Sequence, residues 1–373
     1  MIYFDNAATS FPKPASVWKE TARGFRIYGG TPGRSSHRLS LAAAEKIYDT
    51  RVLLAEFFGF PAPENIIFTL NATYALNMAI KTAVRPGMHV LISNREHNAV
   101  FRPIHRLYLD KCLTYDIFDA ALPPSQALGH LIKKETGMLI LNHVSNVSGD
   151  VADAAAYAAY CKEHGLYMIL DASQSAGHIP FSYRQIPADA ICAPSHKGLF
   201  GIQGAGFLYL SSADERPTFV EGGSGSNSLD ATMPTSLPER YEAGTMPTPA
   251  IASLAEGVNF LMKTDIAEIH EKEALLTRRA FDILSAFPGL SVYGSRNGST
   301  GVISFADKQR PSSEIASLLD EESICTRGGY HCAPLMHRTL GTPDGGAVRL
   351  SFGYFNRLSE LDRLYTALKS IIK

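Results

Sequence analysis

The feature that most constrains the fold of this chain is a series of short apolar segments between residues 65 and 210. Turn residues bound each segment, and helical stretches separate most of them. The segments are too short for helices, and such alternation is typical of a mostly parallel α/β sheet. We predict strands at 66–69, 88–92, 138–141, 167–170, 190–192 and 206–210.

The rest of the chain has a different pattern of predicted helices, loops and strands. Residues 40–59 predict one long helix, with Ser40 as its N-cap and Gly59 as its stop. A stretch rich in glycine, serine and proline at 222–249 is interpreted as a loop. Beyond it we predict, in chain order, helices at 250–263 and 266–286, strands at 290–293 and 302–305, and a last helix at 358–373.

These patterns predict an α/β fold in two parts. A chain of 373 residues is long enough for two or three domains. We expect a large domain at 15–250, which carries the mostly parallel sheet. Residues 1–14 and 251–373 are expected to form a smaller α+β domain. A domain boundary is a common place for an active site.

Charge and cysteine usage exclude several classes of protein. Acidic and basic residues are mixed along the chain and the formal net charge is −1, so nothing indicates binding to nucleic acid or a membrane surface. The first residues do not resemble a signal peptide, and no window approaches a membrane span, so we expect a cytoplasmic protein. The five cysteines form no CxxC pair, which fits neither a disulfide framework nor a zinc site; we expect no metal.

Three residues beside predicted strands suggest a cofactor site. Asp171 follows the strand at 167–170, where it could hold a protonated pyridine nitrogen, cap a helix or bind magnesium. Lys197 follows the next strand in a glycine-rich loop and could form a Schiff base, although a lone loop lysine is usually solvated. Thr73 lies in the first strand-to-helix turn, where a helix N-terminus can seat a phosphate.

Eight motifs occur in order along the chain. They are Phe4-Asp-Asn-Ala-Ala-Thr9, Thr31-Pro-Gly-Arg-Ser-Ser-His37-Arg-Leu-Ser40, Arg95-Glu-His97-Asn98-Ala, Asn142-His-Val-Ser-Asn146-Val-Ser-Gly149, Asp171-Ala-Ser-Gln174, Ser195-His-Lys197, Glu242-Ala-Gly-Thr245 and Arg327-Gly-Gly-Tyr-His-Cys332-Ala-Pro334. With them the chain resembles the class V aminotransferase superfamily, and within it the group II cysteine desulfurases and selenocysteine lyases. The resemblance implies the fold type I architecture and pyridoxal 5'-phosphate (PLP) as cofactor.

The resemblance also implies roles for single residues. Lys197 would carry PLP, Asp171 would hold its pyridine nitrogen, and His97 would stack on the ring and relay protons. Without the resemblance, His97 would be interpreted as an ordinary core or surface histidine. The remaining cofactor contacts would come from Ala72, Thr73, Asn146, Gln174, His196 and Thr245. The family draws the last of these from the partner subunit, which implies a homodimer with shared active sites.

The substrate end is assigned in the same way. Arg349 matches the arginine that grips the substrate carboxylate, a task suited to a planar guanidinium. Arg327 is a second candidate, or it supports the loop of Cys332. Asn6 and His37 are assigned to the substrate as well.

Cys332 determines the expected reaction. A buried, inert thiol is the alternative, but His331 and Arg327 are basic neighbours that would favour the reactive thiolate. The resemblance implies that L-cysteine is converted to L-alanine with a persulfide on Cys332, which is passed to a sulfur-acceptor protein. Two residues depart from the family pattern and would affect the tuning of Cys332 and cofactor affinity. Tyr330 replaces a histidine, and Pro194 replaces a hydroxyl residue.

Other functions remain open from the sequence. A selenocysteine lyase would use the same residues, and in another class V aminotransferase or PLP lyase Cys332 would be incidental. A non-catalytic sulfur carrier on a decayed fold is disfavoured, because Lys197, Asp171, His97 and Cys332 are all retained.

Overall fold

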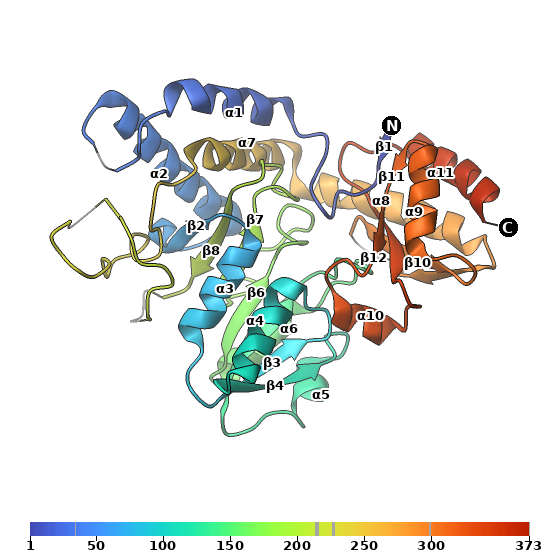
Figure 1. Cartoon of the computed structure of the whole chain (residues 1–373), viewed down its shortest axis with the longest axis horizontal. Coiled ribbons are helices and arrows are strands. Elements are labelled where there is room, and N and C mark those ends of the chain that lie inside the picture. The colour runs from blue at the N-terminus through green and yellow to red at the C-terminus, as the bar shows by residue number, and fades with distance from the viewer. Residues whose placement is uncertain (34, 213–215, 226–227, 298–299, 373) are drawn as a thin grey trace.

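The computed structural model describes residues 1–33, 35–212, 216–225, 228–297 and 300–372. Figure 1 shows two lobes. The larger lobe holds the segments from the blue to the yellow part of the colour scale. The smaller lobe is built from the orange and red C-terminal elements and also contains the N-terminus.

A seven-stranded sheet forms the centre of the larger lobe. The spatial order of its strands is β2-β8-β7-β6-β5-β3-β4. Only β8 is antiparallel to its neighbours, so the sheet is mostly parallel, as predicted. The strands are β2 (Ile66–Thr69), β3 (Met88–Ser93), β4 (Leu113–Phe118), β5 (Thr136–Asn142), β6 (Tyr167–Asp171), β7 (Ala190–Pro194) and β8 (Gly206–Leu210).

Six of these strands are confirmed predictions, and β4 is the one that the sequence analysis missed. It lies at the edge of the sheet. Its end residues Leu113 and Phe118 are buried, whereas Thr114 and Ile117 are exposed. Because the segment is neither continuously apolar nor strictly alternating, its pattern carries no clear strand signal.

Helices cover both faces of this sheet. Because strand side chains alternate between faces, Ile66 and Phe68 join a core formed with α2, α6 and α7, whereas Ile67 joins a core formed with α3 and α4. Burial on both faces explains why these strands are apolar throughout. The helices of this lobe are α1 (Ala15–Ile27), α2 (Arg38–Phe58), α3 (Ala72–Ala83), α4 (Asn98–Leu109), α5 (Pro124–Leu128), α6 (Ala154–Glu163) and α7 (Thr248–Thr264).

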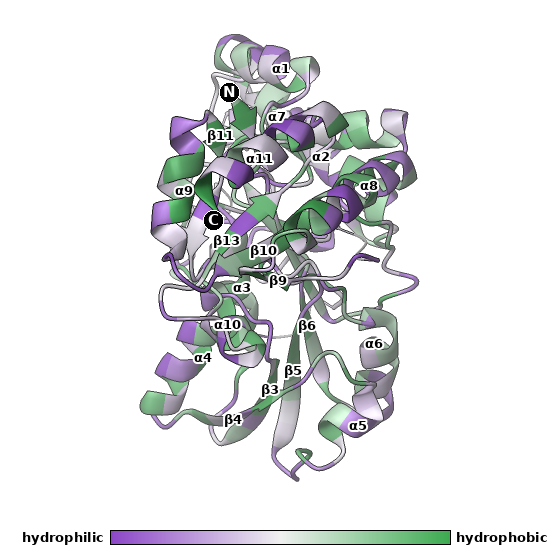
Figure 2. Cartoon of the chain, turned by 90° about the vertical axis from the view of Figure 1, so that its right-hand side faces the viewer, coloured by the Kyte–Doolittle hydropathy of each residue, from purple (hydrophilic) through white to green (hydrophobic). Residues whose placement is uncertain are grey.

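The smaller lobe has its own sheet and its own core. An antiparallel sheet of order β12-β13-β10-β9 packs with α8, α9 and α11, and β1 pairs with β11 in parallel beside it. Figure 2 shows green residues on β13 and β10 and purple ones on the outer parts of α8 and α9. The elements are β1 (Ile2–Tyr3), α8 (Ile266–Ser285), β9 (Leu290–Tyr293), β10 (Val302–Asp307), α9 (Ser312–Glu321), β11 (Ile324–Cys325), β12 (Arg327–Gly329), α10 (Pro334–Leu340), β13 (Ala347–Ser351) and α11 (Leu358–Ile371).

The boundary between the two domains is best placed after α7. This helix packs against α1 and α2, and its residues Ile251 and Leu254 belong to the core of the larger lobe. Asp265 ends α7 and begins α8, where its carboxylate accepts a hydrogen bond from the Ala267 amide at 3.0 Å. We therefore infer a boundary at Asp265 instead of residue 250. Ile2 and Tyr3 pair with β11 of the smaller lobe.

Some local expectations differ from the structure. The N-cap of α2 is His37 and not Ser40: the His37 ring accepts from the Ser40 amide at 3.2 Å, which frees the Ser40 hydroxyl to donate to the Thr31 carbonyl. Gly59 ends this helix with a φ of 70°, as predicted. The described part of the predicted loop at 222–249 has no strand, and α7 begins at its end; residues 226 and 227 of that loop, like Lys373 of the last helix, lie outside the described residues.

Within the described part of the chain, no helix is long and apolar enough to cross a membrane.

Candidate active site

The carboxyl ends of three parallel strands meet at one cavity of about 220 Å³ between the two lobes. Asn142 at the end of β5 is the register partner of Asp171 at the end of β6, and Pro194 ends β7. The cavity is lined by Ala7, Ala8, Asn71, Ala72, Thr73, His97, Ala99, Asn142, Asn146, Asp171, Ser173, Gln174, Pro194, His196, Lys197, Arg327, His331 and Arg349. Nine of the residues assigned from the sequence to cofactor or substrate therefore lie around a single space, together with Arg327 and the departure Pro194.

Asp171 and Lys197 face this cavity from neighbouring strands. One carboxylate oxygen of the buried Asp171 accepts from the Ser173 amide at 2.9 Å. Burial lowers the pKa of the Lys197 amine to about 8, and the nearby Asp171 charge opposes that shift. A lysine with such a pKa holds an appreciable neutral fraction near pH 7.5, and only the neutral amine is a nucleophile.

His97 begins helix α4 and lines the same cavity. Its Nδ1 accepts from the Ala99 amide at 3.0 Å, which leaves the ring proton on Nε2. Burial lowers the pKa of His97 to about 4, and the positive charge of Lys197 adds to that effect. The ring is therefore neutral at physiological pH and can donate a proton from Nε2 only.

The N-terminus of α3 forms another wall of the cavity. Asn71 is the N-cap and accepts from the Tyr74 amide at 2.9 Å, and Ala72 and Thr73 are the first helical residues. A helix N-terminus attracts anions through its free N–H groups and its dipole. His196 faces this space; its carbonyl accepts from the Thr9 hydroxyl and the Lys13 amine, and burial lowers its pKa to about 4.

Several buried polar atoms around the cavity have no partner among the described residues. They are Asn142 Oδ1, Asn146 Oδ1 and His196 Nδ1. Such atoms are costly unless something polar meets them. These groups together fit PLP. The acid can meet the pyridine nitrogen, the lysine amine can bond to the cofactor, the helix N-terminus can hold the phosphate, and the unsatisfied amides can meet the remaining polar atoms.

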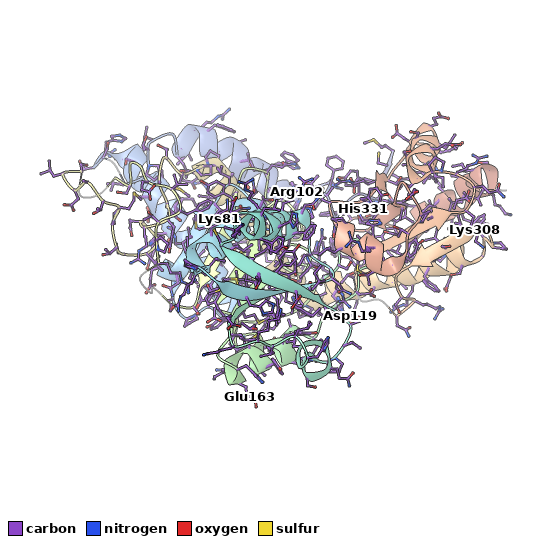
Figure 3. The ribbon with its side chains drawn as sticks, turned by 60° about the horizontal axis from the view of Figure 1, so that its bottom comes forward. Lys81, Arg102, Asp119, Glu163, Lys308 and His331 are labelled. Carbon is purple, nitrogen blue, oxygen red and sulfur yellow. The ribbon has the colours of Figure 1, made fainter. Side chains whose placement is uncertain are left out.

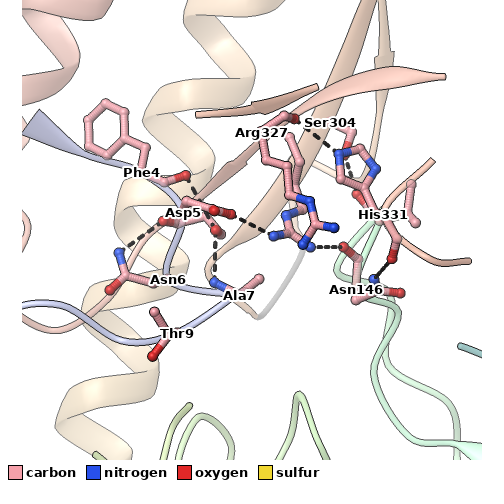
Figure 4. Close-up of polar contacts among 12 residues, drawn as sticks. Phe4, Asp5, Asn6, Ala7, Thr9, Asn146, Ser304, Arg327 and His331 are labelled. Carbon is pink, nitrogen blue, oxygen red and sulfur yellow. Dashed lines mark hydrogen bonds and ion pairs between the residues drawn. The ribbon is translucent and has the colours of Figure 1, made fainter. Parts of the chain in front are cut away.

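The opposite end of the cavity is strongly basic. Arg327 and Arg349 are direct cross-strand partners on β12 and β13. The buried Arg349 donates to Asp5 Oδ1 at 2.6 Å and to the Asn146 carbonyl at 3.2 Å. Figure 4 shows this group, with Asp5 on one side of the arginines and Asn146 and His331 on the other.

Cys332 lies outside this cavity, in an adjoining groove of about 370 Å³ that shares Thr73 and His97 with it. The thiol is half-buried. Its segment is held to the large domain by two hydrogen bonds: the Asn98 amide donates to the Cys332 carbonyl at 2.7 Å, and the Asn146 side chain donates to the His331 carbonyl at 2.8 Å. In Figure 3, His331 lies on the small lobe toward Arg102, which lines the same groove.

His331, expected as a basic neighbour that favours a Cys332 thiolate, carries no charge in this environment. His331 is buried, and burial lowers its pKa to about 3, with the Arg349 charge acting in the same direction. The ring is therefore neutral and contributes no charge that would stabilise a thiolate. Arg327 remains the basic neighbour that would stabilise a thiolate. Tyr330 packs edge-on against His337 at 5.3 Å between ring centroids, and its hydroxyl accepts from the Gly345 amide.

Besides Cys332, three assigned residues do not line the cavity of their own chain. The amide of Asn6 is used by Ser351, Asn356 and the Phe11 backbone, all within 3.1 Å, and therefore holds the N-terminal segment in place. His37 is exposed and caps α2. Thr245 is exposed in the loop before α7.

Asp5 and Asn142 are among the residues at or beside the site that the sequence analysis did not assign. Asp5 contacts Arg349, and Asn142 lines the cavity beside Asp171. A signal for Asp5 was present, because an acid directly after the apolar Ile2-Tyr-Phe4 segment needs a counter-charge once it is buried. The sequence signal for Asn142 was weaker: it is the residue that ends a buried strand of a parallel sheet, where ligands bind.

Comparison with known proteins agrees with this geometry. Residues 2–364 match the model of the family described as aminotransferase class-V, and the chain belongs to this family. A curated relative from Methanothermobacter thermautotrophicus, 30% identical over 99% of this chain and 94% of its own length, is named a probable cysteine desulfurase. A cysteine desulfurase of Escherichia coli is 30% identical over 100% of this chain and 93% of its own.

Solved structures of the same kind superpose on the whole chain. The apo structure of the cysteine desulfurase from Thermococcus onnurineus matches with a TM-score of 0.91 and 29% identity, covering 100% of this chain and 94% of that one. The cysteine desulfurase CsdA of Escherichia coli, in an S-sulfonic acid form, matches with a TM-score of 0.88 and 25% identity over 100% and 95% of the two chains. The predicted fold type and family are thereby confirmed.

Proposed function

We propose that this protein is a PLP-dependent cysteine desulfurase that converts L-cysteine to L-alanine and collects the sulfur on Cys332. The observation that carries the proposal is the position of Cys332 in a groove that shares His97 and Thr73 with the cavity of Lys197 and Asp171. The backbone carbonyls of His331 and Cys332 accept two hydrogen bonds from the large domain, and this fixed backbone supports a role for the thiol against the side chain of a bound amino acid.

The residues of the cavity divide the binding of cofactor and substrate between them. Lys197 would hold the cofactor covalently and Asp171 its pyridine nitrogen, while Ala72, Thr73 and His196 would hold the phosphate. When bound, PLP supplies an electron sink for the carbon that loses a proton. Gln174, whose side chain donates to the Ala7 carbonyl at 2.9 Å, and Asn146 would line the sides of the ring.

The chemistry of this chain's own residues follows from their positions. Arg349 would hold the substrate carboxylate, and the neutral amine of Lys197 would take the proton from Cα. His97 would donate a proton from Nε2. The Cys332 thiolate would then attack the substrate sulfur, so that a sulfur–sulfur bond forms and the carbon–sulfur bond breaks. The electron pair of the broken bond goes to the carbon, which takes up a proton and becomes the methyl group of alanine.

The wider setting is proposed on the same basis. A persulfide must be passed on, so a sulfur-acceptor protein is expected as partner. Thr245 is exposed in its own subunit, which supports a homodimer in which each subunit completes the phosphate site of the other. The chain is expected to work in the cytoplasm.

Replacement of the thiol tests this proposal. Cys332→Ala should still bind PLP and respond spectroscopically to L-cysteine, but alanine formation should fall to the background, because the sulfur has lost its acceptor. Cys325→Ala is the matched control, since Cys325 is also a half-buried free thiol, on β11, and should keep wild-type activity.

The assay also separates the alternatives. Mass spectrometry of the wild-type protein after turnover should find the extra sulfur on the peptide that contains Cys332. Alanine formation at the wild-type rate by Cys332→Ala would refute the desulfurase mechanism in favour of another PLP reaction. Turnover of selenocysteine but not cysteine by the wild-type protein would assign it as a selenocysteine lyase.

A further inference from the structure

The contact between Asp5 and Arg349 joins the two ends of the chain at the basic end of the cavity. The oxygen–nitrogen distance is 2.6 Å; the Arg349 side chain is 1% exposed and that of Asp5 is 20% exposed. The second amino group of the guanidinium donates to the Asn146 carbonyl. The remaining Nε–H is buried and has no partner within the described residues, so one donor of Arg349 is still unsatisfied.

The backbone holds Asp5 firmly in this position. The Phe4 carbonyl accepts from the Ser351 amide at 2.8 Å, and the Asn6 amide donates to the Ser351 carbonyl at 3.2 Å. The Tyr3 hydroxyl donates to the Asp5 carbonyl at 3.2 Å. Ser351 lies two residues after Arg349 on β13. The carboxylate is therefore a fixed part of the site, although Asp5 does not itself line the cavity.

The charges at this end of the cavity are unequal. Arg349 and Arg327 bring two positive charges, and the structure gives Arg327 no ion pair among the described residues. Asp5 brings one negative charge, while the neutral His331 adds none. One more anion balances this end, which suits a ligand with a single carboxylate.

We propose that Asp5 is a specificity-determining residue: as the resident counter-ion of Arg349, it limits how tightly a substrate or product carboxylate is held. A buried guanidinium without a counter-charge gains a great deal from any carboxylate that reaches it. With Asp5 in place the charge of Arg349 itself is already compensated. The ligand carboxylate then adds to this arginine chiefly the contact to the free Nε–H. The alanine product can then leave after each turnover. This inference rests on the proposed function, since it takes Arg349 as the carboxylate site.

Ligand binding to the PLP-loaded protein tests the proposal without sulfur transfer. In Asp5→Asn, the Kd for L-alanine from isothermal titration calorimetry should fall roughly tenfold, the effect expected from one charge-assisted hydrogen bond. The Kd for L-alaninamide, which lacks the carboxylate, should not change. In the Arg349→Ala background, Asp5→Asn should not tighten L-alanine binding, because its effect runs through the arginine.

Controls separate charge from folding. Tyr3→Phe removes a hydrogen bond to the same backbone segment without changing a charge, and should leave the L-alanine Kd as in the wild type. If Asp5→Asn does not fold, Asp5→Ser offers a smaller neutral side chain for the same measurement. Unchanged or weaker L-alanine binding in the folded neutral variant overturns the proposal, as does an absence of binding in both wild type and variant. Failure of the wild type to make alanine from cysteine would refute the proposed function but leave this comparison valid.

Discussion

His331 Nδ1 lies 3.1 Å from His337 Nε2, directly behind the cysteine that is proposed to receive sulfur. The other nitrogen of His331 meets the Arg327 carbonyl at 3.0 Å and must donate to it, because a carbonyl only accepts. His337 then donates to His331, and its Nδ1 accepts from the Thr342 hydroxyl at 2.9 Å. All contacts are satisfied with both rings neutral, in agreement with the lowered pKa of each.

This histidine pair predicts that the protein loses stability in mild acid. Burial lowers the pKa of His331 to about 3 and of His337 to about 4, below the value of about 6.5 for an unfolded chain. The unfolded state therefore binds more protons between pH 6.5 and 4. Stability is fully present above pH 6.5 and falls as the pH drops, by up to about 1.4 kcal/mol per pH unit for each histidine.

Thermal unfolding from pH 8 to pH 5 measures this effect. His337→Gln keeps a donor and an acceptor but no titrating ring, so its Tm should fall less steeply with acid than that of the wild type. His105→Gln, at an exposed position on α4, is the control and should follow the wild type. Equal slopes for all three proteins would contradict the neutral histidine pair.

Lys197 should react with PLP in a pH range unusual for lysine. Because burial lowers its pKa to about 8, the amine becomes neutral as the pH rises through 8 instead of through its ordinary value of 10.5. The rate at which the apo-protein gains the absorbance of lysine-bound cofactor should rise to about pH 8 and then level off. Lys197→Ala should gain no such absorbance, and Lys81→Ala, at an exposed position of α3, should behave like the wild type. A rate still rising at pH 10 would exclude the lowered pKa.

Arg349→Ala should reduce kcat/KM for L-cysteine roughly 10–100-fold, since the substrate carboxylate loses a charge-assisted partner worth about 1.5–3 kcal/mol. Arg349→Lys keeps the positive charge but lacks the planar guanidinium, so it should recover part of the lost kcat/KM. Steady-state kinetics with Arg338→Ala, exposed on α10, provide the control. An unaffected kcat/KM would move the carboxylate site to Arg327.

Thr245 should act in the neighbouring subunit. Thr245→Ala should bind PLP more weakly, by roughly tenfold for one lost hydrogen bond to a charged group. Mixed dimers of Thr245→Ala with Lys197→Ala contain one site with both native residues. At limiting PLP, mixing the two variants under exchange conditions should therefore give more activity than the sum of the two variants measured alone. No gain on mixing would place Thr245 in its own subunit's site or in none.

The sequence was sufficient for most of the fold because its strands are buried on both faces and read as continuous apolar runs. The edge strand β4 escaped prediction because water reaches Thr114 and Ile117. The site residues Asp171 and Lys197 were found from their places after strands, whereas the carboxyl partner of Arg349 was not. A contact between residues 5 and 349 depends on the backbone pairing of Asp5 with Ser351, which no local pattern encodes. The neutrality of His331 was likewise missed, since burial and not composition determines its charge.

The position of Asp5 also bears on the order in which parts of the chain fold during synthesis on the ribosome. The large domain can fold as its strands emerge, but Ile2 and Tyr3 find their partners only when β11 has been made, and Asp5 finds its arginine later still. Until then the first residues of the nascent chain stay without their strand partner. Met1 itself is 84% exposed, so a tag attached there would project into solvent next to the residues that pair with β11.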